Sequence, residues 1–176
     1  MVEIRIIDEV HQDDINIPNE SFALIGKMIP SYVNEHWDHS VCRFAEADIT
    51  EMCFPDEQYQ YAGMKDRSVF IGAYAEGKCI GLAILQDAWF RYMYLYDLKV
   101  SKAYRRTGVA SALLRKAKEV CKARNYAGIY TQGQDNNLAA CLFYIKTGFR
   151  IGGLDTEVYK GTKQEGKADI VFYLDC

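Results

Sequence analysis

Hydrophobic residues that alternate with polar ones, or that form short unbroken runs, predict several strands along the chain. Residues 2–7 alternate Val and Ile with Glu3 and Arg5, which is typical of a half-buried strand. Two apolar runs flank Glu76 and Gly77, and this spacing predicts a β-hairpin. The predicted strands are residues 2–7, 68–75, 78–85, 89–100 and 128–131, followed by a closing hairpin of residues 154–159 and 170–174.

Helical spacing of apolar residues occurs in three places. After Gly108, apolar residues recur every three or four positions with basic residues between them, which predicts an amphipathic helix. Residues 137–146 repeat this spacing and are followed by Gly148, a typical helix C-cap. Residues 22–29 predict a helix that ends at a proline, and the aromatic, acidic stretch after it predicts short helices and loops. The order of elements predicts one α/β domain over residues 1–176 with a mixed sheet.

The composition is that of an ordinary globular protein. Of the 176 residues, 49% are hydrophobic and 26% are charged, which excludes a largely disordered chain. No secretory leader is recognisable, and the longest apolar run, around residues 79–85, is far shorter than a membrane span. Six cysteines without CxxC spacing are expected to be free, mostly buried thiols in a reducing cytoplasm. His36 and His39 form an isolated HxxH pair, which we interpret as a loop feature, so no metal is expected.

The net charge of −3 hides an uneven distribution of charge along the chain. Residues 1–90 carry 6 Lys and Arg against 16 Asp and Glu, whereas residues 91–124 carry 10 against 2. A basic block of this kind can indicate nucleic-acid binding. No nucleic-acid motif accompanies the block, however, and the acidic remainder repels phosphate backbones. The sequence therefore disfavours a nucleic-acid partner.

The basic block contains a strand, a turn and the start of a helix, and together these elements can form a binding site for an anion. Arg105 and Arg106 precede Gly108 and the predicted helix. The N-terminus of a helix has unpaired N–H groups and a partial positive charge, so it binds phosphate without a special side chain. The same residues also fit a helix whose first turn merely happens to be basic. The absence of GxxxxGK[ST] and GxGxxG excludes a Walker A loop and a Rossmann fingerprint.

A second candidate group lies on the later predicted helix. Asn137 and Tyr144 are seven residues apart, so they share a helix face beside a buried stripe. The Tyr144 hydroxyl can be a donor in a cleft, or its ring can be a packed core aromatic. The pattern alone leaves both interpretations open and favours the core.

Together, the two groups resemble the GCN5-related N-acetyltransferase (GNAT) superfamily. Its cofactor motif, Q/R-x-x-G-x-G/A, is matched by Arg105, Gly108 and Ala110. Its later motif is matched by Asn137 and by the sequence FYIKTGF at residues 143–149. Within the superfamily, nearly the whole chain is similar to the subgroup that acetylates streptothricin. The resemblance implies a single-domain fold with a mixed, mostly antiparallel central sheet flanked by helices.

The resemblance implies acetyl-CoA as the acetyl donor. Its pyrophosphate is expected at the basic turn and helix start, its pantetheine arm along the preceding strand, and its sulfur near the tyrosine of the later helix. The implied cofactor-binding residues are Leu98, Val100, Arg105, Arg106, Gly108, Val109, Ala110, Ser111, Asn137 and Tyr144.

The resemblance also implies catalytic roles. The backbone N–H of Leu98 is expected to polarise the thioester carbonyl, and Tyr144 is expected to protonate the departing thiolate. Asp97 is the nearest candidate base for the acceptor amine, and it can equally bind a cationic substrate or cap local amides. A carboxylate often precedes this aspartate in the subgroup, where the present sequence has Tyr96. The implied substrate-binding residues are Trp37, Trp89, Tyr96 and Asp97.

The activity favoured by the resemblance is direct transfer of an acetyl group to an amino group of streptothricin, on its β-lysine arm, which would confer antibiotic resistance. Another small amine or a protein N-terminus is the alternative acceptor, and a non-catalytic coenzyme A sensor is a further alternative. The acidic first half of the chain can attract a cation. We therefore expect a cytoplasmic enzyme with a small cationic amine as substrate and no nucleic-acid or membrane partner, and we allow for a homodimer.

Overall fold

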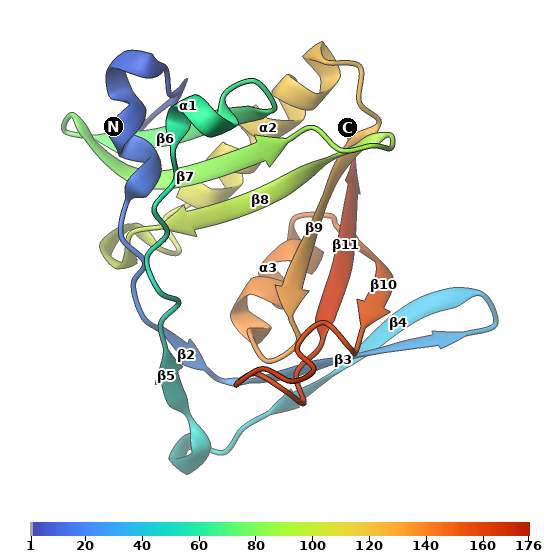
Figure 1. Cartoon of the computed structure of the whole chain (residues 1–176). Coiled ribbons are helices and arrows are strands. Elements are labelled where there is room, and N and C mark those ends of the chain that lie inside the picture. The colour runs from blue at the N-terminus through green and yellow to red at the C-terminus, as the bar shows by residue number, and fades with distance from the viewer. Residues whose placement is uncertain (1) are drawn as a thin grey trace. The chain divides into compact units, whose positions relative to one another are not determined.

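The computed structural model describes residues 2–176 (Figure 1). The chain forms two compact units, each assembled from segments that are far apart in the sequence. The first unit contains residues 2–21, 53–129 and 176, and the second contains residues 22–52 and 130–175. The residues that carry the candidate chemistry are therefore divided between two units.

The first unit is built on antiparallel strands that are largely buried. β6 pairs with β7 around a turn at Glu76 and Gly77, both of which have positive φ. β1 pairs with β6, and β7 pairs with β8 (Figure 1). Continuous apolar runs are typical of strands covered on both faces, and β6 and β7 have this character. The strands are β1 (Glu3–Ile6), β6 (Ser68–Ala75), β7 (Lys78–Gln86) and β8 (Tyr92–Val100), and the helices are η1 (Glu9–Asn16), α1 (Tyr61–Met64), η3 (Lys102–Tyr104) and α2 (Val109–Ala123).

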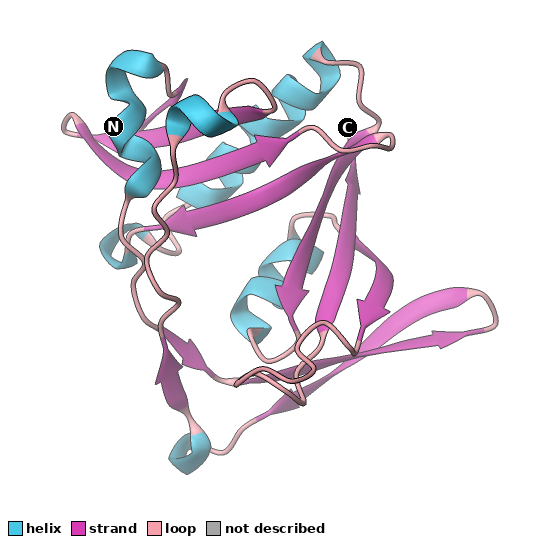
Figure 2. Cartoon of the chain, in the orientation of Figure 1, coloured by secondary structure: helices cyan, strands magenta, loops and turns pink. Residues whose placement is uncertain are grey.

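Helix α2 packs against the strands of the first unit through its apolar stripe (Figure 2). Leu113, Ala117 and Cys121 on this stripe are buried. Gly81 of β7 has no side chain, and a Cβ there would lie 3.1 Å from Val109. The glycine therefore allows the helix to approach the strand closely. This packing fixes the first turn of α2, which carries the motif residues.

Strand β8 contains a β-bulge at its middle residue. Ile84 of β7 pairs with Asp97, whereas Leu85 pairs with Leu95, so Tyr96 is an extra residue in β8. A bulge bends the strand and re-aims the side chains that follow it. The bulge therefore sets the direction of Asp97, the candidate base.

The second unit combines a short sheet, one α-helix, one short 3-10 helix and two small β-ribbons. β10 pairs antiparallel with β11, and the ring of Tyr144 packs against Phe149 and Phe172 in its core. The strands are β2 (Phe22–Leu24), β3 (Gly26–Val33), β4 (His36–Arg43), β5 (Thr50–Met52), β9 (Gly128–Gln134), β10 (Arg150–Asp155) and β11 (Asp169–Asp175), and the helices are η2 (Glu46–Asp48) and α3 (Leu138–Lys146).

The seven strands of the main sheet follow the order β1-β6-β7-β8-β9-β11-β10. β9 begins in the first unit, at Gly128 and Ile129, and its remaining residues belong to the second. Strands and helices alternate along the second half of the chain, as in α/β proteins. The predicted α/β fold with a mostly antiparallel sheet is confirmed.

The prediction for residues 22–67 is wrong where this stretch forms strands: β4 and β5 replace predicted short helices and loops, and His36 and His39 lie in β4 rather than in a loop. Residues 22–29 form β2 and the start of β3 rather than a helix, and β3 pairs along its whole length with β4. Their apolar residues fit helical spacing as well as strand spacing. The pairing is decided by Asn34 and Glu35, which both have positive φ and form a two-residue turn that directs the chain back.

The cysteines and histidines of the described chain show no metal-binding or disulfide arrangement. None of the six cysteines, all in the described part of the chain, forms a disulfide; Cys79, Cys121 and Cys141 are buried, whereas Cys42 and Cys53 are exposed. Among residues 2–176, no group of three or more His, Cys, Asp or Glu side chains is arranged to hold a metal ion. In the same range, no helix has the length and hydrophobicity needed to cross a membrane.

Candidate active site

The N-terminus of helix α2 is open to a ligand. Gly108 is the N-cap residue with φ of +92°, and no side chain caps the helix. The N–H of Ala112 donates to the Gly108 carbonyl at 3.0 Å, so the N–H groups of the first turn before it lack intrahelical partners. A Cβ built on Gly108 would meet no atom within 4 Å. The exposed N–H groups and the positive end of the helix fit an anionic pyrophosphate.

The two arginines before this helix have different surroundings. Arg106 is exposed and has a left-handed backbone with φ of +64°. The Arg105 guanidinium is partly buried and donates to three backbone carbonyls, those of Val100 at 3.0 Å, Ser21 at 2.7 Å and Glu20 at 3.0 Å. The side chain of Arg105 therefore joins the end of β8 to residues 20–21, while Arg106 faces solvent beside the helix N-terminus.

Replacement of Arg105 with alanine is expected to destabilise the protein. The change removes three charge-assisted hydrogen bonds to backbone carbonyls, and we expect a loss of about 1–3 kcal/mol in the free energy of unfolding. Urea denaturation of the variant and the native protein measures this loss. Arg106→Ala is the matched control, since its exposed side chain makes none of these contacts. Equal stability of the Arg105→Ala and Arg106→Ala variants would contradict the prediction.

The predicted residues of β8 lie directly around the bulge. Asp97 follows the extra residue Tyr96, while Leu98 and Val100 pair with Ala83 and Gly81 of β7. Leu98 and Val100 are half-buried, whereas Tyr96 is exposed. The structure thus brings the candidate base, the candidate oxyanion donor and one candidate substrate contact together on consecutive residues.

Asp97 belongs to a network of side chains in the first unit. The Tyr59 hydroxyl donates to Asp97 Oδ2 at 3.2 Å, and Lys99 Nζ lies 3.3 Å from the same oxygen. Lys99 Nζ also donates to Glu57 Oε2 at 2.6 Å. Asn19 Nδ2 donates to that Glu57 oxygen at 2.9 Å. The network places two carboxylates around one ammonium group.

Burial and charge act in opposite directions on this network. Burial raises the pKa of the Asp97 carboxyl, an effect that the neighbouring Lys99 cation and the Tyr59 hydrogen bond only partly offset. Burial also raises the pKa of Tyr59, together with the charge of Asp97, so its hydroxyl remains a donor. Burial alone would raise the pKa of Glu57, but hydrogen bonds from Lys99 and Asn19 outweigh it and lower that pKa. A carboxylate with a raised pKa is better matched to proton abstraction near neutral pH.

The motif residues of the second unit lie on and before α3. Asn137 is the N-cap of α3, and its Oδ1 accepts a hydrogen bond from the Ala140 N–H at 3.3 Å. Tyr144 is 8% exposed, and its ring lies 5.2 Å from both the Phe149 and Phe172 rings, measured between centroids. Within this unit, Asn137 therefore caps helix α3 and Tyr144 packs in the core. The capping hydrogen bond uses the amide oxygen of Asn137, not its amide nitrogen.

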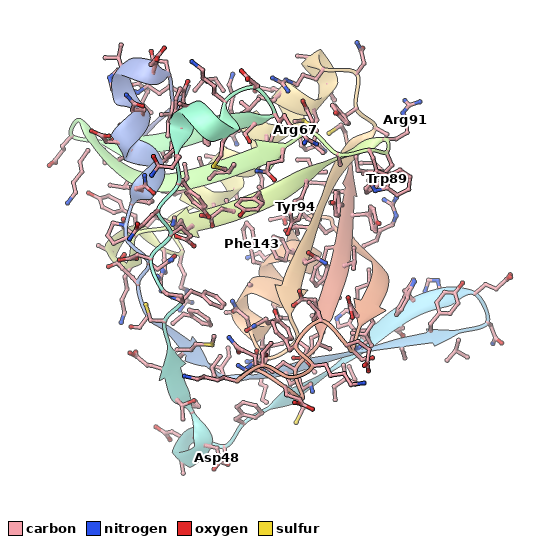
Figure 3. All side chains as sticks on the ribbon, viewed as in Figure 1. Asp48, Arg67, Trp89, Arg91, Tyr94 and Phe143 are labelled. Carbon is pink, nitrogen blue, oxygen red and sulfur yellow. The ribbon has the colours of Figure 1, made fainter. Side chains whose placement is uncertain are left out.

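The aromatic residues predicted to bind substrate differ in their exposure and in the residues around them. Tyr96 lies within 6 Å of both Tyr59 and Tyr94, measured between ring centroids. Trp89 is 95% exposed in the loop before β8, in contact with Phe90, and lies beyond the end of the strand that carries Tyr94 (Figure 3). Trp37 packs against Tyr32 in the second unit.

Sequence reasoning did not identify the other four members of the Asp97 network, Asn19, Glu57, Tyr59 and Lys99. Glu57 and Tyr59 belong to a stretch without regular secondary structure between β5 and α1, and no motif marks them. Lys99 lies two residues after Asp97 on β8. That spacing puts both residues on one side of a strand, and it is the only sequence signal that pointed to a pairing.

A bulged strand followed by an open helix N-terminus, and a later helix with Asn137 at its N-cap and Tyr144 within it, fit the N-acetyltransferase class, whose members transfer acyl groups. The chain matches the Acetyltransferase (GNAT) family over residues 32–149. With this match over more than half of its length, the chain belongs to that family.

Individual relatives are similar to the chain along its whole length. It is 34% identical to streptothricin acetyltransferase A of Bacillus subtilis (strain 168) over 170 residues, which cover 97% of this chain and 98% of that protein. A crystal structure from Bacillus anthracis str. Ames, assigned as a streptothricin acetyltransferase and solved with acetyl coenzyme A, has a TM-score of 0.88 at 30% identity and 100% coverage of both chains. Nourseothricin acetyltransferase shares the fold, with a TM-score of 0.81 at 21% identity over 99% of this chain and 98% of that one.

Proposed function

We propose that the protein transfers an acetyl group from acetyl-CoA to an amino group of streptothricin, on its β-lysine arm, and so confers resistance to that antibiotic. The proposed substrate rests on one observation: the chain is similar, over almost its full length, to streptothricin acetyltransferase A of Bacillus subtilis. The two units would act as one N-acetyltransferase domain over residues 1–176, located in the cytoplasm.

Acetyl-CoA, when bound, supplies an activated thioester. The open first turn of α2 would hold its pyrophosphate through backbone N–H groups, with Arg106 adding positive charge. The strand before the turn would guide its pantetheine arm. The residues proposed to bind it are Leu98, Val100, Arg105, Arg106, Gly108, Val109, Ala110, Ser111, Asn137 and Tyr144.

The proton on the acceptor amine is the main chemical obstacle. An alkyl amine has a pKa of about 10.4, so removing its proton at pH 7 costs about 4–5 kcal/mol. Asp97 would accept this proton, which leaves the amine lone pair to attack the thioester carbonyl. A C–N bond forms and the C–S bond breaks, while the Leu98 N–H stabilises charge on the carbonyl oxygen. Tyr144 would give its proton to the thiolate and regain one from the acylated nitrogen, so that one proton is released overall.

The proposed acceptor is a small cation, and the first unit offers groups that suit one. Aromatic faces and carboxylates attract ammonium groups, and Tyr96 and Asp97 provide both. Trp37 and Trp89 are proposed as further substrate contacts. No nucleic-acid or membrane partner is proposed, and a homodimer remains compatible with this function.

Mass spectrometry of the reaction product tests the proposed function directly. Incubation of the protein with acetyl-CoA and streptothricin is expected to give a product heavier by one acetyl group, and fragmentation is expected to place that group on the β-lysine arm. A boiled enzyme sample is the control for spontaneous acetylation. Acetylation of another small amine or of a peptide N-terminus, with streptothricin unchanged, would replace the proposed substrate with that alternative.

A further inference from the structure

We propose that Lys99 and Glu57 are positioning residues for Asp97: Glu57 anchors the Lys99 ammonium group, and Lys99 orients the Asp97 carboxylate with one oxygen turned to the acceptor amine. The inference rests on the proposed function in that it assigns the proton-accepting role to Asp97. It adds a specific arrangement of charges that no motif of the family marks.

The geometry of Lys99 supports a positioning role. Its Nζ atom lies 2.6 Å from Glu57 Oε2 and 3.3 Å from Asp97 Oδ2. The Lys99 side chain is 12% exposed and that of Asp97 is 15% exposed, so solvent screens this pair much less than a surface ion pair. Lysine is among the residues that are rarely buried without a partner. Here it has two carboxylate partners, both in the same unit.

Glu57 is itself held in place by a distant part of the chain. Asn19 Nδ2 donates to Glu57 Oε2 at 2.9 Å and to the Pro55 carbonyl at 2.9 Å. The backbone N–H of Asn19 donates to Asp56 Oδ1 at 2.6 Å. These three bonds join residues 55–57 to residue 19, so Glu57 is an anchored carboxylate rather than a mobile surface side chain.

The contacts to Asp97 are directed to one of its two oxygens. Tyr59 Oη and Lys99 Nζ both approach Oδ2. Neither of these two contacts involves Oδ1. Tyr59 is fixed in turn, because its ring packs against the buried cluster that includes Ile15 and Phe70. Oδ1 is therefore the oxygen that remains to receive a proton.

The groups around Asp97 act on its ionisation in opposite directions. Lys99 stabilises the carboxylate, and the Tyr59 hydroxyl does so through its hydrogen bond, whereas burial and the negative charge of Glu57 disfavour it. Ile84, the residue opposite Asp97 on β7, is apolar. Removing Lys99 should therefore raise the pKa of Asp97, and removing the Glu57 charge should lower it. An ion pair that does not act on Asp97 predicts neither shift.

NMR titration of the Asp97 carboxyl carbon in the substrate-free protein measures these two effects. The Asp97 signal is identified by its absence from the spectrum of Asp97→Asn. Relative to the native protein, the titration midpoint is expected to move to higher pH in Lys99→Met and to lower pH in Glu57→Gln, with Lys99→Arg close to native. The matched controls are Lys116→Met and Glu119→Gln, which remove another Lys–Glu pair, 2.9 Å long, on the surface of α2. They are expected to leave the midpoint unchanged.

Kinetics of streptothricin acetylation supplies a second measurement. Lys99→Met is expected to lower kcat by roughly tenfold, with the KM for acetyl-CoA unchanged. Midpoints that stay fixed, or that move in the same direction in both variants, would overturn the proposal. If Lys99→Met does not fold, the Asp97 midpoints of the other two variants test the proposal. It stands if the midpoint moves to lower pH in Glu57→Gln and stays near native in Lys99→Arg, and it fails otherwise. If the native protein acetylates no streptothricin, the proposed function fails, while the titration still decides whether Lys99 and Glu57 control Asp97.

Discussion

Replacement of Gly108 with valine is expected to lower the affinity for acetyl-CoA by about a hundredfold or more, equivalent to about 2.7 kcal/mol. Gly108 has φ of +92°, a conformation that a β-branched residue adopts only with strain. Its side-chain direction is open, so valine would meet no protein atom within 4 Å at its Cβ. The added methyl groups would instead occupy the space over the first turn of α2, where the pyrophosphate is proposed to bind.

The matched control for Gly108→Val is Gly77→Val in the turn between β6 and β7. Gly77 has φ of +77° and an equally open side-chain direction, so the strain is comparable while the residue is not part of the α2 N-terminus. Isothermal titration calorimetry gives the affinity for acetyl-CoA, and urea denaturation gives the stability of both variants. A similar loss of stability in both, with lost affinity only in Gly108→Val, is the expected result. Native affinity in Gly108→Val would rule out this helix N-terminus as the donor site.

Replacement of Asp97 with asparagine is expected to lower kcat by about 10²–10³-fold and to leave the affinity for acetyl-CoA unchanged. Asparagine has nearly the same shape, so the contact with the Tyr59 hydroxyl can persist. It cannot accept the amine proton, and it leaves the Lys99 ammonium group with Glu57 as its sole carboxylate partner in the network. Steady-state kinetics with streptothricin and calorimetry with acetyl-CoA measure the two quantities.

The pH dependence of the same reaction sharpens this prediction. Burial raises the pKa of Asp97, and a base must be ionised to act, so the native rate should fall as the pH is lowered through that pKa. Asp97→Asn should lose this acidic limb. Asp87→Asn is the control, because Asp87 also contacts a cation and a tyrosine, namely Arg124 at 2.9 Å and Tyr126 at 3.2 Å. An unchanged acidic limb in Asp97→Asn would assign the base to another group.

The elements predicted correctly are those whose pattern is determined locally. Helix α2 has an apolar stripe at regular helical spacing, and β6 and β7 are apolar runs joined by Glu76 and Gly77, a turn with positive φ at both residues. Local pattern and final packing agree in these elements, so sequence reasoning succeeds.

Residues 22–29 illustrate where local pattern fails. Their apolar residues permit either a helix or a strand, and the outcome depends on pairing with residues 36–43 through the turn at Asn34 and Glu35. Neither residue is glycine, so the turn carries a weak signal. Tertiary pairing therefore overrides a helical spacing that is not strongly amphipathic.

The candidate site was predictable to the extent that its residues adjoin a motif. Gly108 was identified because it belongs to the cofactor motif of the family, and Asp97 because it lies on the strand that precedes the motif. Glu57 and Tyr59 were not, because they reach Asp97 and Lys99 from about 40 positions earlier in the chain. Contacts between such distant segments are set by the fold and leave no periodic trace in the sequence.

The contacts of Arg105 give the first position of the cofactor motif a structural role in this chain. The family pattern admits glutamine or arginine at that position, which suggests that the two are interchangeable. Here the side chain reaches three carbonyls at once, from Glu20, Ser21 and Val100, and only the five-donor fork of arginine can do so. Residues 20 and 21 are also where the chain leaves the first unit for the second. A substitution that the family tolerates would therefore remove some of these contacts at that crossing, so a motif match here is a poor guide to which substitutions are neutral.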